Sequence, residues 1–157
     1  MPEKIETKVT HHFAASPERV YDAMTDPEKV RLWQRAWLVE SGLPGEITHC
    51  EIDPRVGGTF LYAGLRNGRE ARHWGTFLEL DRPTKIVHTW IVDKSEEDDP
   101  SLVTIIIEPA PDGDGSTVTL YNEMDAQWAD YREGTEKGWL AMLAAIDGLL
   151  SGEDARP

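Results

Sequence analysis

One long amphipathic segment near the C-terminus sets the strongest limit on the fold. From Tyr131 onward, apolar residues recur at i, i+3, i+4, i+7, i+10 and i+11: they are Trp139, Met142, Leu143, Ile146, Leu149 and Leu150. This spacing is typical of a helix of about 18 residues or more with a wide apolar stripe. Because such a stripe is stable only when it is covered, the rest of the chain must supply an apolar surface.

Seven segments of alternating or largely apolar character can supply that surface as β-strands. They are Lys4–Phe13, Ile47–Ile52, Thr59–Ala63, His73–Leu80, Lys85–Val92, Leu102–Glu108 and Thr117–Met124. Turn-forming residues separate most of them, such as Gly57-Gly58 and Asn67-Gly68. Short connections of this kind favour an antiparallel meander.

Two short helices are predicted between the first and second strands. Ser16 followed by Pro17 is an N-cap with proline at the first helical position, and this helix should end near Thr25. Asp26 and Pro27 repeat the signal for a second helix. A loop over residues 38–45 is expected to follow.

The element order predicts the α+β class, with a seven-stranded antiparallel sheet packed on the C-terminal helix. The 157 residues provide enough chain for about one domain. We assign residues 1–152 to a single domain and residues 153–157 to a flexible tail.

Charge and apolar patterning exclude several partners. The formal net charge of −13 repels nucleic acid and anionic lipid headgroups. No apolar run reaches the roughly 18 residues that a membrane span needs, and the first residues lack the apolar core of a signal peptide. The only cysteine, Cys50, cannot form an internal disulfide. We therefore expect a cytoplasmic protein with no nucleic-acid or membrane partner.

Catalytic and metal-binding motifs are not evident in the sequence. The five histidines follow no ligand spacing, no serine stands in a nucleophile elbow, and Cys50 lies within a strand pattern. We predict no metal site, no cofactor and no catalytic residue, so that metal chelation leaves the fold unchanged.

Strand alternation predicts which side chains face the helix. On the sixth strand these are Val103, Ile105 and Ile107. On the seventh strand they include Asn122 and Met124, which would make Asn122 a rare polar group inside. For the fourth and fifth strands the inward face is ambiguous, since Trp74 competes with Phe77 and Trp90 with Ile91.

Several local motifs accompany this order of elements. They are Phe13–Ala23, Thr25–Glu28 leading to Trp33, Asp53–Phe60, Gly75–Leu80 followed by Thr89-Trp90, and Gly138-Trp139. Taken in order, they resemble the SRPBCC or START-like superfamily, and within it the activator of heat-shock-protein ATPase homologue-like family. The resemblance implies a helix-grip fold with a cavity between the curved sheet and the long helix. It implies a small-molecule binder more firmly than any reaction.

Candidate ligand-binding residues follow from this expected cavity. Trp33 and Trp37 are expected at its mouth, with Trp128 on the opposite side, and the aromatic residues of the third strand are expected to face inward. The full set is Trp33, Trp37, His49, Phe60, Tyr62, Trp74, Trp90, Ile105, Asn122, Met124, Trp128, Trp139 and Leu143.

The sequence favours a protein that binds a small apolar, aromatic or acyl molecule over an enzyme. One alternative is a polyketide cyclase- or aromatase-like enzyme, in which Tyr62, His73, His88 or Glu79 moves protons. It requires at least two ionisable groups facing inward together. The other alternative is a co-chaperone-like or stress-response interaction module that contacts a chaperone, which requires an exposed apolar or basic patch.

Overall fold

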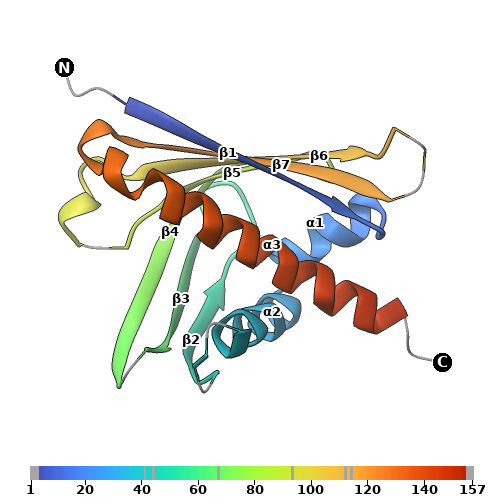
Figure 1. The fold of residues 1–157 in the computed structure, drawn as a ribbon, viewed down its shortest axis with the longest axis horizontal. Coiled ribbons are helices and arrows are strands. Elements are labelled where there is room, and N and C mark those ends of the chain that lie inside the picture. Colours follow the sequence, from blue (N-terminus) through green and yellow to red (C-terminus); the bar gives the residue numbers. More distant parts are fainter. Residues whose placement is uncertain are drawn as a thin grey trace.

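Seven antiparallel strands form one sheet that curves around a long C-terminal helix (Figure 1). The computed structural model describes residues 4–154 except 41, 44, 67, 93, 112 and 114, and leaves out the side chains of 128, 153 and 154. The strand order across the sheet is β1-β7-β6-β5-β4-β3-β2. The predicted meander is therefore correct, and β1 adds an edge strand to it by pairing with β7.

The helices and strands follow the order that the sequence predicts, with two 3-10 helices in addition. In chain order they are β1 (Lys4–Phe13), α1 (Pro17–Thr25), α2 (Pro27–Glu40), β2 (Ile47–Ile52), β3 (Thr59–Arg66), β4 (Arg69–Asp81), β5 (Lys85–Trp90), the 3-10 helix η1 (Lys94–Glu96), β6 (Ser101–Pro109), β7 (Ser116–Asp125), the 3-10 helix η2 (Ala126–Tyr131) and α3 (Arg132–Asp154). The α+β class and the helix-grip architecture are confirmed.

Capping residues set the ends of the first two helices. The Ser16 hydroxyl accepts a hydrogen bond from the Arg19 backbone N–H at 3.4 Å, as expected for an N-cap. Asp26 both ends α1 and caps the next helix, since its carboxylate accepts from the Glu28 backbone N–H at 2.9 Å. Arg82 then joins α1 to the turn between β4 and β5 through two 2.9 Å hydrogen bonds to Asp22.

The predicted loop over residues 38–45 is wrong at its start, because α2 continues to Glu40. Leu38 is buried and packs against the sheet. A Cβ added to Gly64 on β3 would lie 2.8 Å from a Leu38 methyl group. This contact stabilises one further turn of α2. It joins two distant segments of the chain, so no local sequence pattern predicts it.

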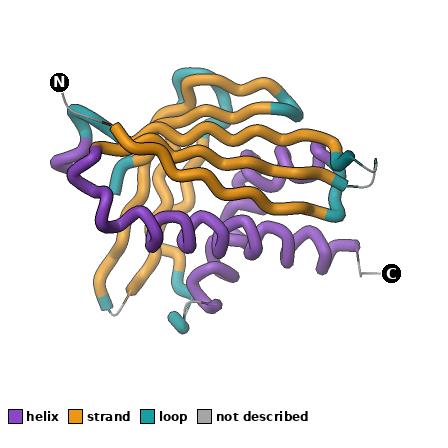
Figure 2. Tube along the Cα trace, turned by 45° about the horizontal axis from the view of Figure 1, so that its top comes forward, coloured by secondary structure: helices purple, strands orange, loops and turns teal. Residues whose placement is uncertain are grey.

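The sheet bends strongly, so that β2, β3 and β4 turn away from the direction of β1, β7 and β6 (Figure 2). α3 crosses the concave side. Its buried residues Leu143, Ile146 and Leu150 join the core together with the inward residues of β6 and β7. The alternation predicted for those two strands is confirmed, because Val103 and Leu120 are fully buried.

A β-bulge explains why alternation does not predict the inward face of β4 and β5. The register of β4 against β5 shifts between Phe77 and Glu79, and the two strands meet again at an isolated bridge between Trp74 and Ile91. Phe77 belongs to the core.

Among the described residues, no helix is long and apolar enough to span a membrane.

Candidate functional site

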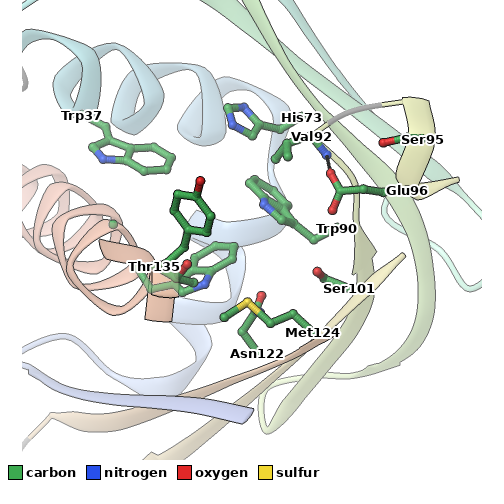
Figure 3. Close-up of a pocket in the computed structure, with 13 residues that line it drawn as sticks. Trp37, His73, Trp90, Val92, Ser95, Glu96, Ser101, Asn122, Met124 and Thr135 are labelled. Atoms are coloured by element: carbon green, nitrogen blue, oxygen red, sulfur yellow. Dashed lines mark hydrogen bonds between the residues drawn. The ribbon is translucent and has the colours of Figure 1, made fainter. Parts of the chain in front are cut away.

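A cavity of about 440 Å³ opens between the concave face of the sheet and the N-terminal half of α3 (Figure 3). The strands contribute its floor, η1 contributes one side, and α2 contributes the other through Trp37. The lining residues are Trp37, His73, Trp90, Val92, Ser95, Glu96, Ser101, Asn122, Met124, Tyr131, Thr135, Gly138 and Trp139. Trp37 lies opposite Ser95 and Glu96 across the space (Figure 3).

Nine of the predicted candidates lie in the cavity wall or directly beneath it. Those in the wall are Trp37, Trp90, Asn122, Met124 and Trp139. Trp33, Phe60, Tyr62 and Ile105 surround a much smaller space of about 30 Å³ that shares Trp90 and Trp139 with the cavity. The structure thus brings together residues from α2, α3 and four strands.

Three further candidates lie elsewhere, and the fourth, Trp128, is not placed. Trp74 lines an open groove of about 590 Å³ with Leu61 and Ile91, separate from the cavity. His49 is 39% exposed on β2, with its ring 3.9 Å from the Glu70 carboxylate. Leu143 is fully buried in the core. The Trp128 side chain is outside the described part of the structure.

Sequence reasoning missed part of the lining. Tyr131, Thr135 and Gly138 fall at i, i+4 and i+7, so they continue the helical spacing toward the N-terminus of α3, and this signal could have found them. Ser95 and Glu96 belong to an acidic turn that resembles a solvated hairpin tip in sequence. Only the curvature of the sheet places that turn at the cavity.

Trp90 is the centre of the aromatic wall. Its ring stacks on His73, with centroids 4.9 Å apart and planes 20° apart. It also contacts Trp139 at 4.9 Å and Phe60 at 5.9 Å. Aromatic pairs at these separations add to the stabilisation from burial alone. The wall is therefore preorganised around one indole.

Burial keeps the inward histidines neutral. Desolvation lowers the pKa of His73 to about 4, and nearby Arg66 acts in the same direction. Desolvation also lowers the pKa of His88 to about 4, although a hydrogen bond from its ring to the Thr89 carbonyl oxygen, at 2.8 Å, opposes the shift. Burial raises the pKa of the Tyr62 hydroxyl. These three groups are uncharged at neutral pH.

The remaining polar groups of the site are few. Asn122 is 2% exposed and lines the inner part of the cavity. The Glu96 carboxylate accepts a hydrogen bond from the Val92 backbone N–H at 3.1 Å. The Trp139 indole N–H is buried and makes no hydrogen bond to the described residues. Among those residues, no group of three His, Cys, Asp or Glu side chains could hold a metal ion.

Stability should fall as the pH falls from about 6.5 to about 4. His73 and His88 have a lower pKa in the folded protein than the ordinary histidine value of 6.5, so the unfolded chain takes up protons first as the pH falls. The stabilisation is complete above about pH 6.5 and is lost as the pH approaches the folded value. Urea unfolding between about pH 7.5 and 5 measures it.

Matched substitutions identify the groups responsible. His88→Gln should make the loss of stability with falling pH shallower, whereas His12→Gln, at an exposed position of β1, should leave it unchanged. Equal pH dependence in His88→Gln and the unaltered protein would contradict the assignment to His88.

Comparison with known proteins identifies related sequences and structures. The family model described as "Activator of Hsp90 ATPase homolog 1-like protein" matches residues 14–151. No curated protein matches the sequence.

Solved structures share the fold over nearly the whole chain. A Staphylococcus aureus protein of unknown function has a TM-score of 0.81 at 15% identity, covering 99% of this chain and 98% of its own. A Nitrosomonas europaea protein has a TM-score of 0.76 at 21% identity, with 97% of each chain covered. An AHSA1-like protein from Aeromonas hydrophila has a TM-score of 0.74 at 19% identity, covering 97% and 96%. At these identities the likeness shows the fold alone.

Proposed function

The chain belongs to the Activator of Hsp90 ATPase homolog 1-like family, and we propose that it binds a small, mostly apolar molecule in the cavity between its sheet and α3. The observation that carries this proposal is the cavity itself. Its volume of about 440 Å³ lies within the roughly 300–1,000 Å³ of small-molecule sites. Three indoles, from Trp37, Trp90 and Trp139, supply apolar surface for the ligand.

The arrangement of ionisable groups supports binding over the cyclase-like alternative. Of the four residues predicted for that chemistry, only His73 lines the cavity. His88 and Tyr62 lie beneath it, in the aromatic cluster. The Glu79 carboxylate instead pairs with Lys85 at 3.4 Å, and both side chains are accessible to solvent. A cytoplasmic location and a single domain over residues 1–152 complete the proposal.

Thermal unfolding in a screen of aromatic, polyketide-like and acyl compounds tests this function. At a free ligand concentration of about 100 times Kd, binding stabilises the fold by about 2.7 kcal/mol. For a domain of this size, each kcal/mol shifts Tm by roughly 2–4 °C, so we expect a rise of about 5–10 °C. Tryptophan fluorescence should change in the same titration, because Trp37, Trp90 and Trp139 line the site. A screen in which no compound changes either signal would contradict the proposal.

A further inference from the structure

Asn122 places a buried polar group in the wall of the cavity. Its side chain reaches the wall from β7, and the residue is 2% exposed. Its backbone is paired on both sides, in register with Thr7 on β1 and with Val103 on β6. The two ladders fix the backbone of Asn122, so only its side chain can adjust to a ligand. Figure 3 shows Asn122 and Trp37 on opposite sides of the cavity.

The Asn122 side chain makes no hydrogen bond to the described residues. Thr7 is within reach, because directly paired residues on one face of a sheet have Cβ atoms about 4.5–5.5 Å apart. The Thr7 hydroxyl is nevertheless buried without a hydrogen-bond partner in the described part of the chain, so no bond joins the two side chains. Buried amides nearly always have partners. The donor and the acceptor of Asn122 are therefore available to a molecule in the cavity.

The geometry of a carboxamide selects among ligands. It presents an N–H donor and an oxygen acceptor along one planar edge. A ligand satisfies both when it carries an acceptor and a donor side by side, as the edge of adenine does for asparagine. Ser101 and Thr135 add hydroxyls to the wall, but a hydroxyl rotates to donate or to accept. Asn122 therefore discriminates between ligand edges where these hydroxyls do not.

The aromatic wall favours a flat body behind that edge. The rings of His73 and Trp90 stack with their planes 20° apart, and Trp139 packs against Trp90 with centroids 4.9 Å apart. Aromatic rings prefer offset-stacked or edge-to-face contacts with one another. A planar ring system can make such contacts here while its polar edge meets Asn122.

We propose that the ligand of this cavity is a neutral flat molecule with a hydrogen-bond donor and an acceptor side by side, such as a lactam fused to an aromatic ring, and that Asn122 binds this edge through two hydrogen bonds. This inference rests on the proposed function and specifies the chemistry of its ligand. A ligand without the donor leaves the buried Asn122 oxygen unpaired, which costs more than the loss of an exposed contact. A carboxylate is disfavoured for the same reason, because it offers acceptors only.

Two isomeric probes separate the polar edge from size and shape. 4-Methylquinolin-2-one keeps the lactam N–H beside its carbonyl oxygen, whereas 1-methylquinolin-2-one carries the methyl group on that nitrogen. Naphthylmethanol is the third probe and presents a single hydroxyl on a similar body. Each is titrated into the full chain by isothermal titration calorimetry. We expect 4-methylquinolin-2-one to bind at least about tenfold more tightly than its isomer, because only it pairs with both atoms of the carboxamide.

Two substitutions locate the effect. Asn122→Leu keeps a side chain of similar size but removes its donor and acceptor, so the advantage of 4-methylquinolin-2-one over its isomer should fall to less than about twofold. Thr7→Val removes the neighbouring hydroxyl, which does not line the cavity, and should leave that advantage unchanged. Thermal unfolding checks that both variants are folded.

The outcomes distinguish this inference from the function on which it rests. Equal affinities of the two isomers for the unaltered protein would overturn the preference for the lactam edge, and binding of naphthylmethanol would then leave the binding function standing. An undiminished preference in Asn122→Leu, or an equal loss in Thr7→Val, would overturn the assignment to Asn122. Failure of all three probes to bind would contradict the binding function, and this inference with it.

Discussion

Leu143→Ala is expected to lower the free energy of unfolding by about 2–5 kcal/mol. Leu143 is fully buried on the face of α3 that meets the sheet, and it belongs to the same core as Val103 and Leu120. The shorter side chain loses apolar burial and leaves a void that the surrounding strands fill only in part. Urea unfolding followed by circular dichroism measures the loss, which corresponds to a Tm lower by about 4–20 °C.

Leu140→Ala is the matched control. It makes the same chemical change on the same helix, but Leu140 is 40% exposed. Its cost should stay below about 1 kcal/mol. Equal losses in the two variants would contradict the packing of this face of α3 against the sheet.

Gly138→Leu is expected to weaken binding of naphthylmethanol at least tenfold. Gly138 lines the cavity, and a Cβ added there would have no atom within 4 Å. A leucine side chain therefore occupies space that the ligand needs, while the helix gains a residue of higher propensity. Fluorescence titration measures the affinity, and the rise in Tm at the same ligand concentration should become smaller.

Gly134→Leu controls for the change in helix propensity. Gly134 lies one turn earlier on α3, is exposed, and also has open space around an added Cβ, but it does not line the cavity. Its affinity for naphthylmethanol should match that of the unaltered protein. Retention of binding in Gly138→Leu would mean that the probe binds at another place.

The elements of this fold are largely determined by short-range signals, which explains why they can be predicted. Ser16-Pro17 and Asp26-Pro27 start the helices, and alternation identifies each strand, because capping and side-chain direction act over a few residues. The stripe that includes Leu143 predicts the helix at the centre of the fold. Packing between distant segments has no such signal, and for this reason the sequence does not predict the extension of α2 through Leu38.

The candidate site was predictable only in part, for related physical reasons. Asn122 follows from the unbroken alternation of β7. Trp74 does not, since β4 and β5 lose their regular register near the bulge after Phe77 and alternation no longer decides the face. Glu96 reaches the cavity only because the sheet curves and returns the turn after β5 toward α3. Because this curvature is a property of the whole sheet, the local sequence around Glu96 does not predict its position.

The indole N–H resonances of the six tryptophans provide the most direct test of ligand binding in the cavity. In a titration with naphthylmethanol, assigned by single Trp→Phe substitutions, the signals of Trp37, Trp90 and Trp139 should shift together and saturate. Trp74 lines the separate groove, and its signal should stay in place. A saturating shift of Trp74 while the three cavity signals stay unchanged would contradict the account and place the ligand outside the cavity.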